Sequence, residues 1–167
     1  MSGLVEFKKL ISGLEDGRLK KMDSEGNPVE VIFKLTEPAN QNEILQVEQD
    51  LGKLLPYGYK EFLLQYNGAR LYDYEGLDGY VLLGTKDIVS TNRFVASTFE
   101  EDWIDNFIIF AKYIGEGNYL AFDSRTEEYK VVDCFMEELP QDWNEVASSF
   151  DVFLKEIIKS QGRKYWL

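Results

Sequence analysis

Histidine is missing from this chain of 167 residues, and basic residues are scarce. Without histidine the chain can have no Ser-His-Asp or Cys-His nucleophile system, no imidazole general base and no zinc site with a His ligand. The 18 Lys and Arg stand against 30 Asp and Glu, which gives a formal net charge of −12. Nucleic acids and anionic membrane surfaces are bound by clustered Lys and Arg. Direct binding to nucleic acid or to a membrane is therefore not expected.

Cysteine occurs once, as Cys134, so the chain can form neither an intramolecular disulfide nor a cluster of thiolate ligands. Such low cysteine use is typical of proteins in a reducing cytosol. The residues that flank Cys134 on either side, Val132-Asp133 and Phe135-Met136, include no cation that would favour its thiolate. We expect an ordinary buried thiol in a β-strand rather than a nucleophile.

Long apolar segments are also missing. The longest purely apolar run covers residues 107–111, which is far too short to cross a bilayer. Residues 1–9 do not combine a basic segment with an apolar stretch of signal-peptide length. The content of 44% hydrophobic and 14% aromatic residues is typical of a globular protein with one core. We expect a single domain over residues 1–167, in a soluble and cytoplasmic protein.

The N-terminal part of the chain has the patterns of a helix and a hairpin. Apolar residues at helical spacing predict a helix within residues 4–15, and these residues are Leu4, Phe7, Ile11 and Leu14. A turn-forming cluster at residues 23–28 separates two strand-like runs, residues 18–22 and 29–35. This arrangement predicts a β-hairpin with one buried face.

Two more helices are predicted between residues 40 and 68. Asn40 and Glu43 have the spacing of a capping box, in which each side chain satisfies a free backbone amide of the other residue. Gly52 is close to the end of this helix. Pro56 then occupies the expected first turn of a third helix, where no amide donor is needed, and Asn67-Gly68 ends it. We expect these two helices to form a pair.

The sequence pattern changes to that of β-strands after residue 70. Runs rich in β-branched and aromatic residues predict strands at residues 71–74, 80–83, 107–114, 119–123 and 129–135. The short links between the last three favour an antiparallel meander. The polar segment 85–105 is expected to be partly helical around residues 94–103. A final helix is predicted from the apolar stripe Val146, Phe150, Phe153 and Ile157.

Segments that approach catalytic or cofactor motifs lack essential parts of them. Residues 79–86 approach a phosphate-binding loop, but Thr precedes the Lys and the interior is strand-like. Residues 115–120 have the first two glycines of a dinucleotide fingerprint without the third. Neighbouring carboxylates point in different directions, and residues 73–78 lack the ligand count and spacing of a calcium loop. We expect no catalytic residues, no cofactor and no metal.

Several short motifs occur in an order that one known family shares. Thr36-Glu-Pro-Ala-Asn-Gln-Asn-Glu-Ile44 is followed by Val47-Glu48, Leu51-Gly52, Leu55-Pro56, Tyr59, Phe62-Leu63 and Tyr66-Asn67-Gly68. Further motifs are Gly115-Glu-Gly-Asn-Tyr-Leu-Ala-Phe-Asp123 and Ala147-Ser-Ser-Phe150 with Phe153-Leu154. Together they span most of residues 36–155. In type and order they resemble the SUKH superfamily, which includes the fungal regulators of cell-wall synthesis.

The resemblance implies an α+β fold in which several helices pack against a mostly antiparallel sheet. It also implies a protein that is not an enzyme. Bacterial members of the superfamily are mostly immunity proteins that bind and block secreted polymorphic toxins, many of them nucleases, whereas fungal members act in regulatory complexes. The hairpin-like stretch at residues 18–35 is an extension that shorter members need not have.

The negative charge is concentrated in the middle of the chain. Residues 72–145 contain 17 acidic and 5 basic residues, net −12, whereas residues 1–71 are net −2 and residues 146–167 are net +2. The densest cluster lies within residues 99–105. We predict a partner-binding surface formed by Glu100, Glu101, Asp102, Trp103, Asp105, Asp73, Glu75 and Asp78. The alternative interpretation is a solvated acidic surface, with Trp103 in the core.

These observations support an immunity protein that binds a cognate basic toxin domain, expected to be a nuclease. An inhibitor that occludes a nuclease can present the clustered negative charge that the substrate offers, together with aromatic anchors. A regulatory or scaffold module that binds a cellular protein, without a toxin partner, is the alternative. A carboxylate-dependent hydrolase is a third hypothesis, and it requires two carboxylates that converge in a pocket.

Overall fold

A computed structural model describes all of residues 1–167, and its eight strands form one antiparallel sheet. Each strand pairs with its neighbours in the sequence, so that the spatial order is β1 to β8. The strands are β1 (Arg18–Met22), β2 (Pro28–Leu35), β3 (Ala69–Tyr74), β4 (Asp78–Leu82), β5 (Phe107–Tyr113), β6 (Tyr119–Asp123), β7 (Lys130–Cys134) and β8 (Asn144–Ala147). The antiparallel meander expected for the last strands thus extends through the whole sheet.

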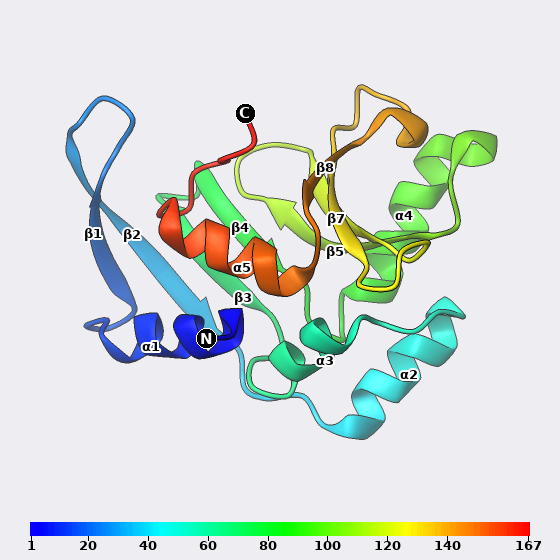
Figure 1. Cartoon of the computed structure of the whole chain (residues 1–167), viewed down its shortest axis with the longest axis horizontal. Coiled ribbons are helices and arrows are strands. Elements are labelled where there is room, and N and C mark those ends of the chain that lie inside the picture. The colour runs from blue at the N-terminus through cyan, green and yellow to red at the C-terminus, as the bar shows by residue number, and fades with distance from the viewer.

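Five α-helices accompany the sheet, which gives the expected α+β fold. They are α1 (Gly3–Ser12), α2 (Gln41–Leu51), α3 (Tyr57–Leu63), α4 (Ile88–Phe99) and α5 (Phe150–Lys159). Two short 3₁₀ turns, Glu100–Asp102 and Pro140–Asp142, complete the secondary structure. In Figure 1, α1 and α5 lie beside each other in front of the sheet, α2 and α4 lie toward one end, and the β1–β2 hairpin extends at the other. None of the helices combines the length and apolar character that a membrane span requires.

Side-chain caps stand at the starts of α1, α2 and α5. The side chain of Ser2 accepts a hydrogen bond from the Val5 amide, and that of Ser149 accepts one from the Val152 amide. Asn40 and Glu43 form the predicted capping box, and Gly52 ends α2 in the left-handed conformation with φ 68°. These polar side chains satisfy amides that have no partner inside the helix. The capping box predicted for α2 is therefore confirmed.

Four helix boundaries differ from the prediction. The final helix begins at Phe150, because Val146 belongs to β8 and Ser149 caps the helix. The apolar spacing of Val146 and Phe150 was coincidental, since both side chains reach the same core from different elements. The helix expected around residues 94–103 begins earlier, at Ile88, and α3 ends at Leu63, before the glycine at position 68. Pro56 precedes α3 as its N-cap rather than lying in the first turn.

The two middle helices are linked by Glu48 of α2 rather than by direct packing of their faces. Its carboxylate accepts a hydrogen bond from the Leu55 amide at 2.7 Å and lies 3.2 Å from the Lys60 ammonium group of α3. The main helix contacts of α2 are with α4, and those of α3 are with α5. The carboxylate of Glu48 is 6% exposed, so the residue acts as an internal link between the α2–α3 loop and α3.

Aromatic side chains form the centre of the core between the sheet and α5. Phe110 of β5 stacks on Phe122 of β6 with ring centroids 4.0 Å apart, and Phe150 of α5 meets both rings nearly edge-on. Tyr59 of α3 packs against the same three rings, and its hydroxyl donates to the Leu83 carbonyl. The thiol of Cys134 is buried in β7, as expected, and burial raises its pKa. One aromatic cluster therefore joins α3, α5 and the middle of the sheet.

Asn92 attaches α4 to the sheet where the pairing of β4 with β5 ends. Its amide nitrogen donates to the Ile109 carbonyl at 2.9 Å, and its side-chain oxygen accepts from the Ile109 amide at 2.7 Å. The side-chain nitrogen also donates to the Ile88 carbonyl within the helix. The side chain thus replaces the hydrogen bonds that another strand would make to Ile109.

We expect the substitution Asn92→Ala to destabilise the fold by about 2 to 4 kcal/mol, because it leaves the buried amide and carbonyl of Ile109 without partners. Urea unfolding followed by tryptophan fluorescence measures this loss. The matched control is Asn42→Ala on the exposed face of α2, which should change the unfolding free energy by less than about 0.5 kcal/mol. Equal effects of the two substitutions would contradict this role of Asn92.

Candidate functional site

Residues 100–105, here called the acidic turn, connect α4 to β5. Glu100, Glu101 and Asp102 form a 3₁₀ turn and are all exposed. None of the three takes part in an ion pair, and none accepts a side-chain hydrogen bond. Glu100 has φ 53° and ψ −120°, a positive φ that is uncommon for a residue other than glycine, and the chain turns there after α4. Three uncompensated carboxylates are therefore presented together on a tight turn.

Trp103 anchors the acidic turn to the body of the protein. Its ring packs against Phe107 and Trp143 with centroid distances of 6.3 and 6.2 Å, and Phe99 also packs against Trp143, at 5.4 Å. The side chain is half-buried, so most of it supports the turn and only part is open to a partner. Asp105 pairs with Lys53 of the α2–α3 loop at 2.9 Å, although its own carboxylate is 87% exposed.

The second predicted group lies at the opposite end of the sheet. Asp73 pairs with Arg70 at 3.1 Å and accepts from the Gly76 amide, while Asp78 accepts from the Gly79 amide at the tip of the β3–β4 hairpin. Glu75 occupies the same tip with φ 51°. The Gly79 carbonyl accepts a hydrogen bond from the amide of Ile114, directly after the end of β5, so the hairpin lies at that end of the strand. The acidic turn lies at the other end, before the first residue of β5. A seven-residue strand of about 23 Å separates the two groups. The structure therefore does not bring the eight predicted residues into one cluster.

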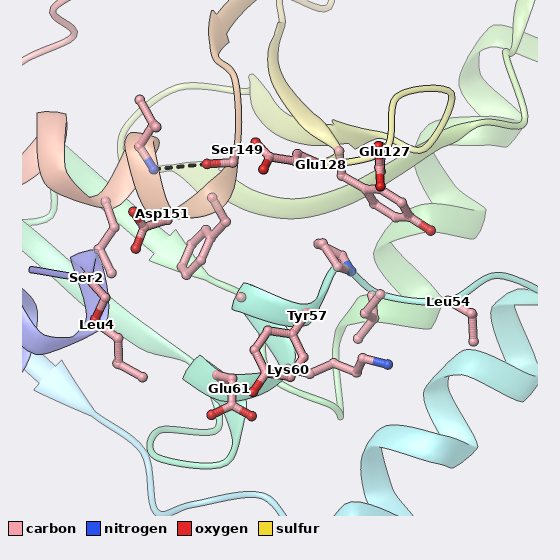
Figure 2. A pocket seen from close by; sticks show the side chains of 17 residues that line it. Ser2, Leu4, Leu54, Tyr57, Lys60, Glu61, Glu127, Glu128, Ser149 and Asp151 are labelled. Carbon is pink, nitrogen blue, oxygen red and sulfur yellow. Dashed lines mark hydrogen bonds between the residues drawn. The ribbon is translucent and has the colours of Figure 1, made fainter.

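A groove that the sequence did not indicate lies on the same side of the molecule as the acidic turn. Its volume is about 790 Å³, within the usual range for binding sites. The groove is formed by the N-terminal ends of α1, α3 and α5 and by the β6–β7 loop, as Figure 2 shows. Its apolar lining includes Leu4, Leu54, Leu55, Tyr57, Phe150, Val152 and Leu154. Carboxylates of Glu61, Glu127, Glu128 and Asp151 lie among these apolar groups.

One wall of the groove depends on the close contact of α1 with α5. The Gly3 amide donates to the Asp151 carboxylate at 2.6 Å, and a Cβ atom at Gly3 would approach the Asp151 carbonyl oxygen to 2.7 Å. Only glycine fits this contact without a shift of one helix. The Asp151 carboxylate also pairs with Lys155 at 3.1 Å. Asp151 is therefore engaged inside the protein and is not a free charge of the groove.

The opposite wall is the β6–β7 loop, residues 124–129, which Asp123 holds in place. Burial opposes ionisation of Asp123, but hydrogen bonds from the Arg125 guanidinium and the Arg125 amide hold the pKa of this carboxyl below its usual value. The amide and hydroxyl of Ser124 both donate to the Asn106 carbonyl. Because Asn106 directly follows the acidic turn, the loop that carries Glu127 and Glu128 is attached to that turn.

The floor of the groove continues to the acidic turn through the α2–α3 loop. The side chains of Leu54 and Tyr57 are strongly exposed, at 64% and 75%. Leu55 lies between these two residues in the sequence, and its amide donates a hydrogen bond to the Glu48 carboxylate. Lys53, next to Leu54, pairs with Asp105 of the acidic turn. The groove and the acidic turn are therefore adjacent parts of one end of the sheet. In contrast, no group of three or more acidic or cysteine side chains is arranged to hold a metal ion.

The fold places this protein in the class of α+β proteins whose antiparallel strands follow one another in sequence order. Comparison with known sequences identifies the family. The sequence model of the SMI1 / KNR4 family (SUKH-1) matches residues 38–156. The chain belongs to this family. It is also similar to the uncharacterized protein YnaB of Bacillus subtilis (strain 168), with 25% identity over 139 residues, which cover 82% of this chain and 88% of YnaB. The resemblance seen in the sequence motifs is thus confirmed.

The sequence carried little signal for the groove. Its residues come from the beginning, middle and end of the chain, and each short segment resembles an ordinary helix start or turn. One signal in the sequence is the pair Leu54 and Tyr57, which stand on either side of Leu55-Pro56. Neither belongs to the apolar stripe of a predicted helix, so a surface position was open to both. The pair Glu127-Glu128 is one of several acidic pairs in the sequence, such as Glu137-Glu138, and nothing in its surroundings distinguishes it.

We expect Asp123→Asn to destabilise the protein by about 1 to 3 kcal/mol at pH 7, because the charged hydrogen bonds to Arg125 are weakened. The folded-state pKa of Asp123 is lowered, so the stabilisation is present above its unfolded pKa and disappears as the pH falls through the folded pKa. Urea unfolding at a series of pH values from 7 down to about 2 tests this. The difference between the two proteins should shrink at the acidic end.

Asp142→Asn is the matched control, since Asp142 is exposed and its carboxylate makes no hydrogen bond. Its unfolding free energy should follow that of the unmodified protein at each pH. A constant difference between Asp123→Asn and the unmodified protein across the whole series would show that ionisation of Asp123 is not involved.

Proposed function

We propose that this protein is an immunity protein that binds and blocks a cognate toxin domain through its acidic surface. The observation that carries the proposal is the acidic turn, in which three exposed carboxylates have no cation within the protein. Membership of the SUKH superfamily supports the proposal, because immunity to secreted toxins is a frequent role in this group. A basic toxin domain, such as a nuclease, would supply the missing positive charge.

The electrostatics favour a partner that binds nucleic acid. A nuclease domain presents cations to phosphates, and a turn with three carboxylates offers the same cations a competing anionic surface. Long-range attraction of this kind raises association rates by about 10 to 10³-fold at low salt. The anchoring of the turn by Trp103 and Phe107 reduces the conformational entropy lost on binding.

The proposed mode of action is occlusion of the partner and involves no catalysis by this chain. The one cysteine is buried, and burial raises the pKa of its thiol above the ordinary value, which disfavours the reactive thiolate. The acidic turn and the β3–β4 hairpin lie at opposite ends of β5, so their carboxylates do not converge on a reacting group. We further propose one domain over residues 1–167 that acts in the cytoplasm, with neither nucleic acid nor membrane as a direct partner.

A second candidate is a regulatory or scaffold module that binds a cellular protein and has no toxin partner. The fungal regulators in the superfamily and the same exposed acidic surface are compatible with this role. The two functions differ in the neighbouring genes and in protection of cells from a toxin. The gene next to this one is therefore the most informative observation, because an adjacent toxin domain would identify both the partner and its activity.

We expect simultaneous reversal of Glu100, Glu101 and Asp102 to Lys to weaken binding to the adjacent toxin domain at least about tenfold and to reduce protection of cells. The reversal repels the cations that the acidic turn attracts. Affinity is measured by surface plasmon resonance at two or more salt concentrations, and protection by growth of cells that express the toxin. Binding by the unmodified protein should weaken as salt increases.

The matched control reverses Glu25, Glu137 and Glu138 together, three exposed glutamates outside the acidic turn and the groove. This variant has the same change in net charge and should retain most of the affinity and the protection. Full protection by the reversed acidic turn would refute this turn as the binding site. The absence of any toxin that the protein inhibits would refute the immunity function itself.

A further inference from the structure

We infer that the groove between α3, α5 and the β6–β7 loop binds a cationic segment of a protein partner, with one aromatic or aliphatic side chain of that segment inserted into the apolar lining beside Tyr57. The identity of the partner as the toxin rests on the proposed function. The chemistry of the segment is argued from the groove alone. The proposal adds an apolar anchor site to a surface that is otherwise defined by charge.

The apolar lining of the groove includes strongly exposed side chains. Tyr57 is 75% exposed, Leu54 is 64% exposed and Val152 is 37% exposed, and all three line the groove. The lining also includes the buried side chains of Leu55 and Phe150, which are part of the rigid core. A Tyr that is exposed beside aliphatic groups on a rigid base is typical of the centre of a protein interface. Covering these groups removes apolar area from water without rearrangement of the core.

The charges of the groove fall into two kinds, those already neutralised and those left free. Lys60 pairs with Glu48, and Asp151 pairs with Lys155 and accepts from the Gly3 amide. Glu61, Glu127 and Glu128 have no ion pair and no side-chain hydrogen bond. The groove therefore presents a net negative rim around an apolar floor. Complementarity requires an occupant with positive charges on either side of an apolar side chain.

An anionic ligand does not fit the same groove. The first turns of α1 and α5 meet there, and free helix amides would attract an anion. However, the Asp151 carboxylate already lies against the Gly3 amide, and Ser149 binds the Val152 amide. At each of these helix starts, a side chain of the protein thus already binds one of the first-turn amides. The three free glutamates would repel a phosphate or a nucleotide.

The position of the groove connects this segment to the proposed toxin interface. Lys53 joins the groove residue Leu54 to Asp105 of the acidic turn, and the β6–β7 loop is attached to Asn106 through Ser124. Figure 2 shows Glu127 and Glu128 on one side of the groove and Tyr57 and Glu61 on the other. A basic partner seated on the acidic turn can therefore extend a segment across the rim into the groove.

The first experiment uses the purified full chain and a capped pentapeptide, Lys-Arg-Trp-Arg-Lys, followed by NMR of the ¹⁵N-labelled protein. We expect saturable shifts at residues 54–61, 127–129 and 149–152, with a dissociation constant of about 1 mM or tighter. Control peptides replace the Trp by Ser or the four basic residues by Glu, and both should bind at least about tenfold more weakly. Shifts spread over all acidic segments, or equal binding of the Ser peptide, would overturn the anchor site.

The second experiment compares two double reversals with the same change in charge. Glu127→Lys with Glu128→Lys alters the rim of the groove, and Glu137→Lys with Glu138→Lys alters an exposed pair in the β7–β8 connection, outside the groove. We expect the first pair, and separately Tyr57→Ala, to weaken binding of both the pentapeptide and the toxin domain at least about tenfold. The second pair should change either affinity less than about threefold. Circular dichroism confirms that each variant is folded.

The outcomes separate the groove from the proposed function. Toxin binding that is lost on reversal of the acidic turn but unchanged by the groove variants would overturn the groove and leave the immunity function intact. If no toxin is inhibited, the immunity function fails, and the pentapeptide measurement still decides the groove. A concentration-dependent dimer that the Glu127 and Glu128 reversals dissolve would show that a second copy of this chain occupies the groove, and it would overturn the proposed occupant.

Discussion

The packing of Phe150 against Phe110, Phe122 and Tyr59 is the contact on which the rest of the structure depends. These rings join the first turn of α5 to the middle of the sheet and to α3. Because α5 begins at this point, its N-terminal end lies beside α3 and the start of β7, and Gly3 of α1 can then approach Asp151. The groove is the open side of the same junction. Its floor is thus as rigid as the core beneath it.

Acidic residues serve two separate purposes in this protein. Glu48, Asp123 and Asp151 are bound by backbone amides and by cations of the chain, and they fix the loops and helix ends that surround the groove. The glutamates of the acidic turn and of the groove rim have no such partners. Charge that is neutralised internally contributes to the fold, whereas charge that is left free is available to a partner. The net charge of −12 includes both kinds, so only the structure separates them.

Much of the fold was predictable because its signals are local. The hairpin of β1 and β2, the capping box of Asn40 and Glu43, and the strands from β5 to β7 follow from residues close together in the sequence. Predictions failed where distant contacts decide the outcome. Val146 and Phe150 share an apolar spacing, yet Val146 lies in β8, which pairs with β7, and Ser149 caps a helix that begins at Phe150. Similarly, the role of Asn92 is invisible without Ile109, seventeen residues away.

The sequence by itself determined the α+β character, the family, the excess of negative charge and its concentration in residues 72–145. These properties depend on residue type, spacing and order. The tertiary structure alone decided that Asp73, Glu75 and Asp78 lie a strand length away from the acidic turn, and that Leu54, Glu127 and Val152 line one groove. The physical reason is that a surface is assembled from segments distant in the chain, and their positions are set by core packing and strand pairing rather than by their own sequences.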